Sequence, residues 1–216
     1  MVERWNRLRE WKDYLEKAKL RLKVDSFLKD YLREAGYAGM SMSVTPLGTQ
    51  ISIYAQRTGL VIGVGGRNIR ELTEILEKQF NLSNPQIAVV PIENPDLEPY
   101  IVACRVADAL VKGVRYRRVA RWAINRMMRA GALGAQIMIT GKLGSERSRF
   151  EKLTAGYLPH SGEPAISQVK TAVVHVLLKP GMVGIKVKIL PPNAKFPDVV
   201  ELKSAPAGGE IAEVES

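Results

Sequence analysis

The chain has 216 residues, 46% of them hydrophobic, and its 32 Lys and Arg against 22 Asp and Glu give a formal charge of +10. This composition favours a folded protein over a disordered one, and the excess positive charge predicts a polyanionic partner, nucleic acid before an anionic membrane. The single Cys104 excludes an intrachain disulfide framework, as expected in a reducing compartment. No apolar run has the length of a signal peptide or a membrane span, so we expect a cytoplasmic protein without a membrane partner.

The first half of the chain shows helical and then strand patterns. Apolar residues recur every three or four positions up to Ala35, and Gly36 ends this pattern. The predicted elements are helices over about 3–22 and 24–35, strands over 40–45 and 49–56 joined by a turn at 46–48, a short helix, a glycine-rich loop, a helix over 69–80 and a strand over 86–92.

The second half begins after a linker at 93–96 and contains two helices followed by strands. The predicted helices cover about 98–112 and 116–130, and the predicted strands cover 135–142, 152–158, 169–179 and 183–190. Apolar and basic residues alternate from Ile185 to Ile189, which predicts one buried and one solvated face. We therefore expect an α+β protein in four parts: a helical extension over 1–22, a first domain over 23–94, a second domain over 95–192 and a disordered tail over 193–216.

The loop from Gly63 to Gly66 carries the most specific chemical signal. Its spacing excludes a P-loop, which requires G-x-x-x-x-G-K-[ST], and a dinucleotide-binding G-x-G-x-x-G. The segment from Ile62 to Ile69 instead matches I-G-x-x-G-x-x-I, and the order of elements around it resembles the type II KH domain. In that domain the G-x-x-G turn binds the backbone of a single-stranded nucleic acid. The candidate RNA-binding residues of this KH loop are Gly63, Val64, Gly65, Gly66, Arg67, Asn68 and Arg70.

This loop departs from the usual KH pattern in one respect. KH loops usually carry a basic residue at one of the two variable positions, which are Val64 and Gly65 here. The glycine amide groups and the nearby Arg67 and Arg70 still offer donors and positive charge to a phosphate. Two interpretations remain open: a loop that binds phosphate weakly, and a loop that is architectural or packs against protein.

A second candidate surface contains nine cations between residues 115 and 149, where Glu146 is the only acid. We call it the basic surface, and its members are Arg115, Arg117, Arg118, Arg121, Arg126, Arg129, Lys142, Arg147 and Arg149. On a helical wheel, five of these arginines cover one half of the helix predicted over 116–130, and apolar residues cover the other half. Because no carboxylate lies four residues from them, we expect these arginines to be unpaired and to bind phosphate.

Trp122 lies within the same arc of the helix as the arginines. An exposed tryptophan at this place stacks on nucleic-acid bases, whereas a tryptophan at the edge of the arc packs against the core between helix and sheet. Both roles remain open, and the sequence favours the core position.

The sequence gives no support for catalysis or for a metal site. His160, His175 and Cys104 are too few to assemble an ordinary set of metal ligands. We expect His175, on an apolar strand, to be a core residue and His160 to lie in a turn. No pair of carboxylates lies in the apolar setting that acid–base chemistry requires. We therefore expect neither an enzyme nor a cofactor.

Several longer segments resemble the small-subunit ribosomal protein S-three family, in its archaeal and eukaryotic form. They read AGYAG from Ala35, TPLGT from Thr45, RELTE from Arg70, RAGALG from Arg129, TGKLG from Thr140 and HSGEP from His160, and residues 59–66 and 171–189 match as well. The likeness covers about residues 22–191. It implies a type II KH domain with a three-stranded sheet, followed by a domain in which two helices lie on a sheet.

The resemblance also implies a function and partners. Members of the family are structural components of the head of the small ribosomal subunit, where they contact ribosomal RNA, neighbouring head proteins and the path by which messenger RNA enters. Arg117, Arg118 and Arg121 match the basic residues that contact the entering message, and Trp122 stands where bacterial relatives have a further basic residue. The alternative expectation is a free-standing KH-type RNA-binding regulator or chaperone.

Overall fold

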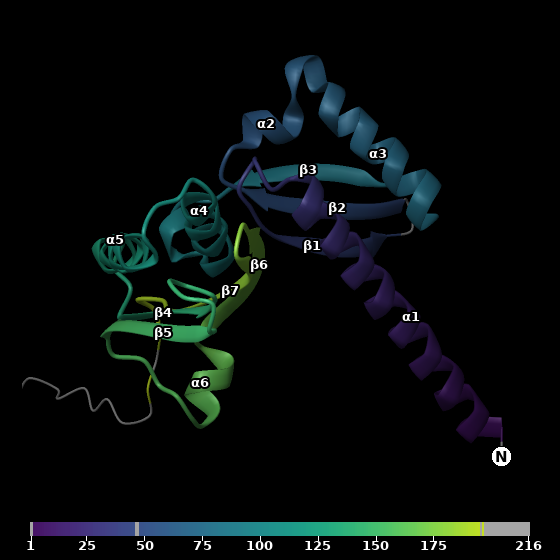
Figure 1. Ribbon diagram of the computed structural model, residues 1–216. Helices are drawn as coiled ribbons and strands as arrows, with labels where there is room; N and C mark the ends of the chain where they lie inside the picture. Colours follow the sequence, from purple (N-terminus) through teal and green to yellow (C-terminus); the bar gives the residue numbers. More distant parts are fainter. Residues whose placement is uncertain (1, 46–47, 195, 197–216) are drawn as a thin grey trace, which may run out of the picture.

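The computed structural model describes residues 2–45, 48–194 and 196, and it contains two β-sheets, each with its own helices (Figure 1). The first unit comprises α1 (Val2–Tyr31), β1 (Tyr37–Thr45), β2 (Gly48–Ala55), α2 (Thr58–Ile62), a short 3-10 helix (Val64–Gly66), α3 (Arg67–Phe80) and β3 (Gln86–Pro91). The second comprises a 3-10 helix (Pro95–Leu97), α4 (Pro99–Val111), α5 (Tyr116–Arg129), β4 (Gly134–Gly141), β5 (Arg149–Gly156), α6 (Glu163–Ser167), β6 (Lys170–Leu178) and β7 (Gly181–Leu190). The predicted α+β class is confirmed.

The first sheet has the strand order β1-β2-β3, in which β1 and β2 are antiparallel and β2 and β3 are parallel. The central strand β2 buries Ile51 and Ile53, which pack with Val24 and Leu28 of α1 and with Leu72 of α3 in one core. A parallel pair of strands needs a crossover connection, and α2 and α3 supply it between β2 and β3. The KH loop lies within this crossover.

The helix α1 is continuous over 30 residues, whereas two helices meeting near residue 22 were expected. No glycine or proline interrupts the chain before Gly36, so nothing stops the helix where the apolar pattern changes. Val24 and Leu28 are buried on the first sheet, but Trp11 and Leu22 are exposed. Figure 1 shows the N-terminal part of α1 leading away from both sheets.

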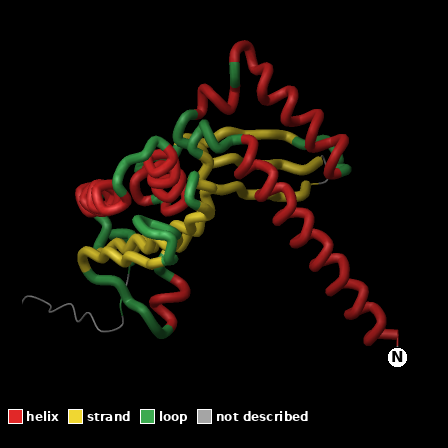
Figure 2. Tube along the Cα trace, in the orientation of Figure 1, coloured by secondary structure: helices red, strands yellow, loops and turns green. Residues whose placement is uncertain are grey.

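The second sheet is antiparallel throughout and has the strand order β5-β4-β7-β6. The helices α4 and α5 lie together on one side of it (Figure 2). The strand β7 turns Ile185 and Val187 into the core with these helices, and the intervening Lys186 is exposed. The predicted alternation of this strand is therefore confirmed.

Some predicted features differ from the structure or lie beyond it. The short helix α6 was not predicted, although Pro164 in its first turn favours a helix start there. Residues 46–47 of the predicted hairpin turn, and residues 195 and 197–216 of the predicted disordered tail, lie outside the described residues.

Polar contacts join the two units. Arg33, which follows α1, donates to Asp108 of α4 over 3.1 Å. Arg105 of α4 donates to Gln56, which follows β2, over 2.8 Å, and it also pairs with Asp96 in the segment between the two sheets. These contacts place α4, and with it the start of the second unit, against the first.

Candidate nucleic-acid interface

The KH loop turns sharply because three of its residues have positive φ angles. Gly63 adopts φ 72° and ψ 176°, a combination essentially restricted to glycine, and Gly65 and Gly66 have φ values of 61° and 75°. A Cβ atom on Gly63 would lie 2.6 Å from Cγ of Asn68. The first glycine of the motif is therefore required by both its backbone conformation and its close neighbour.

The side chain of Asn68 has a structural role in this loop. Its Nδ2 donates to the carbonyl oxygen of Leu60 over 2.9 Å and so joins the start of α3 to α2. The amide of Gly63 donates to Gly59 over 2.9 Å, and that of Gly66 donates to Gly63 over 3.3 Å. These donors hold the shape of the loop, so they are not free to bind a phosphate.

The outer side of the loop exposes a valine rather than a cation. Val64 is 95% exposed, and a Cβ atom placed on Gly65 or Gly66 would meet no non-adjacent residue within 4 Å. Nearby positive charge comes from Arg67, which pairs with Glu71 over 3.2 Å, and from Arg70, which forms no ion pair with the described residues. The loop combines an approachable backbone with little charge of its own.

The helix α5 has the two faces that its sequence predicts. Val119, Ala120, Ala123, Ile124 and Met127 are buried against the second sheet. All nine cations of the basic surface are exposed. The spacing of apolar residues therefore places the arginines of α5 on its solvent side.

Two of the arginines expected to be unpaired form ion pairs, which corrects that expectation. Nε of Arg117 lies 3.0 Å from Oε1 of Glu151 on β5, and Nε of Arg126 lies 2.7 Å from Oδ2 of Asp96. The hydrogen bond to Glu151 raises the pKa of Arg117. Both partners lie far from the helix in sequence, so a search for carboxylates four residues away missed them. The other arginines of α5 and Lys142 form no ion pair with the described residues.

Trp122 belongs to the exposed side of α5, so its expected position at the edge of the core is wrong. Its side chain is 47% exposed, and Cζ of Arg126 lies 5.4 Å from the centre of its ring. An accessible aromatic beside a guanidinium is a suitable platform for a nucleic-acid base. His175 was also expected in the core, but the alternation of β6 turns it to solvent.

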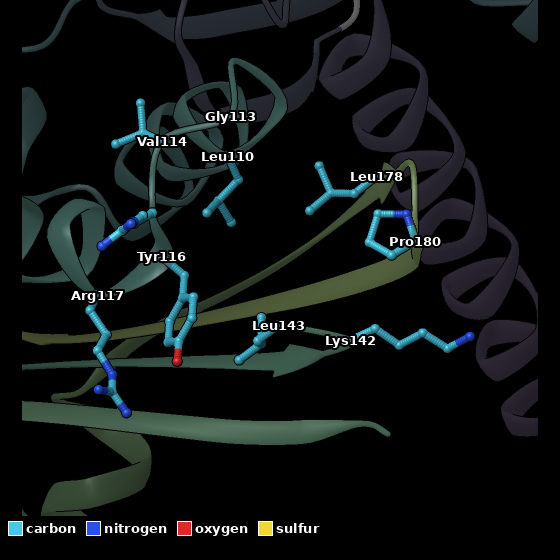
Figure 3. A pocket seen from close by; sticks show the side chains of 10 residues that line it. Leu110, Gly113, Val114, Tyr116, Arg117, Lys142, Leu143, Leu178 and Pro180 are labelled. Carbon is cyan, nitrogen blue, oxygen red and sulfur yellow. The ribbon is translucent and has the colours of Figure 1, made fainter. Parts of the chain in front are cut away.

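A groove beside the start of α5 was not predicted from the sequence (Figure 3). It has a volume of about 510 Å³ and brings together Arg115, Arg117 and Lys142 of the basic surface. Arg147 lies in the connection from β4 to β5, and Arg149 is the first residue of β5. Arg129 lies at the far end of α5, roughly 18 Å along the helix from Arg117. The basic surface is therefore extended rather than a single cluster.

Comparison with known proteins gives matches to both units of the chain. A family model described as KH domain matches residues 23–97, and one described as Ribosomal protein S3, C-terminal domain, matches residues 106–189. The small ribosomal subunit protein uS3 of Thermofilum pendens is 51% identical over 83% of this chain and 89% of its own length. Those of Methanobrevibacter smithii and Haloarcula marismortui are 44% and 45% identical, each over 88% of this chain.

The chain belongs to the small ribosomal subunit protein uS3 family. The match covers 76% of the length of the uS3 protein from Methanobrevibacter smithii and 62% of that from Haloarcula marismortui. Membership of this family confirms a ribosomal protein with a KH domain and a C-terminal helix-on-sheet domain. It also agrees with the expectation that the chain is a component of the ribosome rather than an enzyme.

Two features common to metal and membrane proteins are not seen among the described residues of this uS3 chain. Over residues 2–45, 48–194 and 196, no three His, Cys, Asp or Glu side chains lie together in a way that would hold a metal ion. None of the helices in the same part of the chain has the length and apolarity that crossing a membrane requires.

Proposed function

We propose that this uS3 chain binds ribosomal RNA in the head of the small subunit and helps to form the path by which messenger RNA enters. The observation that carries the proposal is the face of α5 on which Arg117, Arg118 and Arg121 are exposed opposite a buried apolar face. The resemblance of these positions to the message-contacting residues of the family supports the same assignment.

The positive charges on the exposed face of α5 favour the binding of a polyanion. Arg118 and Arg121 form no ion pair with the described residues, and like charges this close repel each other on the isolated protein. Phosphate groups remove that repulsion and release their counterions. Guanidinium groups also contact phosphate through two parallel hydrogen bonds, which lysine cannot do.

In this proposal the KH loop has a secondary part in RNA binding. A Cβ atom placed on Gly65 would meet no non-adjacent residue within 4 Å, so an RNA backbone can approach this side of the loop, whereas Asn68 and Gly63 maintain its shape. The absence of a cation at either variable position makes the expected contact weaker than that of the basic surface. We assign the loop a positioning role toward RNA.

We retain the four-part division of the chain, into 1–22, 23–94, 95–192 and 193–216, as part of the proposal. The KH match over 23–97 agrees closely with the part over 23–94, and the C-terminal match over 106–189 falls within the part over 95–192. The remaining proposed partners are neighbouring proteins of the head, and the proposed location is the ribosome in the cytoplasm. Nothing specific favours the free-standing regulator, since relatives matched over both units are ribosomal subunit proteins.

Cross-linking in assembled small subunits tests this function. A message carrying 4-thiouridine on the side from which it enters is bound to subunits that contain the chain, and cross-linked peptides are identified by mass spectrometry. We expect a cross-link within Arg115–Arg129, and none when the 4-thiouridine lies on the opposite, outgoing side. Cross-links from the entering side to other subunit proteins alone would contradict the proposal.

A further inference from the structure

The groove beside α5 has an apolar interior and a positively charged rim. Its lining comes from the end of α4 and the turn after it, the start of α5, the loop after β4, and the end of β6 with its connection to β7. In Figure 3, Tyr116 and Leu143 lie in the middle of the groove, Arg117 lies on one side of Tyr116, and Lys142 extends on the other. No carboxylate is among the described residues that line it.

The apolar interior continues the core of the second unit outward. Leu110 is buried, and Tyr116, Leu143 and Leu178 are half-buried and pack against the same core. A volume of about 510 Å³ lies within the range of ~300–1,000 Å³ typical of small-ligand sites. This open end of the core therefore offers an apolar surface with the dimensions of a ligand site.

We propose that the groove holds an unpaired nucleobase of the RNA strand that binds the basic surface. The inference rests on the proposed function of that surface, and it adds recognition of bases to recognition of phosphates. A nucleobase is planar and largely apolar on its faces, and it is always accompanied by a phosphate on each side. The groove matches this pattern, because Tyr116 and Leu143 offer apolar area between the cations Arg117 and Lys142.

Two contacts fix the position of the Arg117 side chain on the rim of the groove. Cζ of Arg117 lies 5.7 Å from the ring centre of Tyr116, so a base near this ring also meets a guanidinium. Glu151 holds the same guanidinium in place through hydrogen bonds of 3.0 and 3.4 Å. The cation is therefore ordered before RNA arrives, which lowers the entropy cost of binding.

An RNA strand fits the groove better than a protein segment for reasons of charge. An apolar side chain of a neighbouring protein would satisfy the interior but would leave Arg115 and Lys142 without anions unless acidic residues accompanied it. RNA brings an anion with every base. A base paired within a duplex is stacked on its neighbours and cannot enter, so the groove is selective for single strands.

The test compares RNA with and without bases on the full-length chain. Affinity is measured by fluorescence anisotropy for an oligouridine of about 12 nucleotides and for the same strand with abasic positions at its centre. We expect the abasic strand to bind about 5- to 100-fold more weakly. Tyr116→Leu, which retains apolar packing, should remove most of this difference and leave the dependence of affinity on salt unchanged.

Tyr157→Leu is the matched control, because Tyr157 is an exposed tyrosine of the same unit that does not line the groove. A second measurement uses 5-iodouridine, which cross-links to aromatic side chains that contact the base, and the expected product joins it to Tyr116. The inference would be overturned if the two strands bind with equal affinity. It would also be overturned if Tyr116→Leu leaves the difference in affinity between the strands unchanged and no cross-link to Tyr116 forms. Either result leaves the phosphate-binding proposal standing, because that proposal depends on the salt dependence of the arginine variants.

Discussion

Arg126 of α5 and Asp96 of the segment between the sheets form an ion pair, with Nε and Oδ2 2.7 Å apart. The other carboxylate oxygen of Asp96 accepts a hydrogen bond from Arg105 of α4, and Arg105 also reaches Gln56 in the first unit. The side chain of Asp96 is 19% exposed, so these contacts are partly shielded from water. One carboxylate thus connects the exposed arginine side of α5 to the contacts between the two units.

Asp96→Asn should raise RNA affinity and lower the stability of the protein. The substitution releases Arg126 to bind phosphate, which should increase the log–log slope of affinity against salt by about 0.7 to 0.9. It also leaves Arg105 without its carboxylate, at a cost of about 1–3 kcal/mol in the free energy of unfolding. Anisotropy over a salt series and urea unfolding measure the two effects.

Glu71→Gln is the control, because it frees Arg67 from an exposed pair on α3, where little stability is expected to be lost. The prediction would be contradicted if Asp96→Asn destabilises the protein no more than Glu71→Gln does and leaves the salt slope of the parent chain unchanged. Asp96 would then neither stabilise the protein measurably nor restrain Arg126.

Val64→Lys should strengthen RNA binding through the KH loop. Val64 is almost fully exposed on the loop, so the longer side chain meets no steric obstacle. If the loop lies beside RNA, the new cation should increase the salt slope by about 0.7 to 0.9. Val44→Lys adds the same charge to β1, at another exposed valine. Equal effects of the two substitutions would assign the loop a purely architectural role.

Two tyrosine hydroxyls and a cysteine thiol near the contact between the units predict a loss of stability at alkaline pH. Burial, followed by the hydrogen bond to Asp25, raises the pKa of Tyr37 above its ordinary value of 10.0. Burial also raises the pKa of Tyr100 above 10.0 and that of Cys104 above 9.0. The unfolded chain therefore releases these protons at lower pH than the folded chain, so the free energy of unfolding should fall as pH rises above about 9.

Tyr37→Phe isolates one part of this effect. Its hydroxyl donates to Oδ1 of Asp25 over 2.5 Å, and its loss should lower stability by about 1.5–3 kcal/mol at neutral pH. The variant should also lose less stability than the parent chain between pH 9 and 11, since one titrating group is gone. Urea unfolding across this pH range gives both values, and a parallel fall in the two proteins would contradict the assignment to Tyr37.

Most of the helices and strands could be predicted from the sequence, because the local sequence patterns agreed with the tertiary packing. The strands β1–β3 and the helices α4 and α5 follow from apolar periodicity and glycine stops, and the glycine loop was located from four residues in order. The two predicted helices of α1 are one helix because a shift in apolar pattern is not a helix stop. His175 faces solvent because the register of β6, rather than the apolar character of its neighbours, decides which side it takes.

Contacts between distant segments limited the prediction of the candidate site. The partners of Arg117 and Arg126 lie 34 and 30 residues away, and no local pattern marks them. The groove is formed by four separate segments of the chain. Only three of its lining residues, Arg115, Arg117 and Lys142, stood out in the sequence, because of their positive charge. Trp122 was assigned to the core because a helical wheel does not reveal how far a neighbouring sheet extends. Charge composition therefore located the surface, and three-dimensional packing decided its details.

The salt dependence of RNA binding by Arg117→Ala/Arg121→Ala tests the central claim most directly. The matched control is Lys12→Ala/Lys17→Ala, which removes two exposed cations from α1. If both arginines contact phosphates, with Arg117 exchanging Glu151 for phosphate, the double arginine variant should bind RNA more weakly and its log–log slope should fall by about 1.4 to 1.8. If Arg117 stays paired with Glu151, the fall should be about 0.7 to 0.9, and in either case the control stays close to the parent chain. An unchanged slope in the arginine variant, or an equal fall in both, would contradict the assignment of RNA binding to α5.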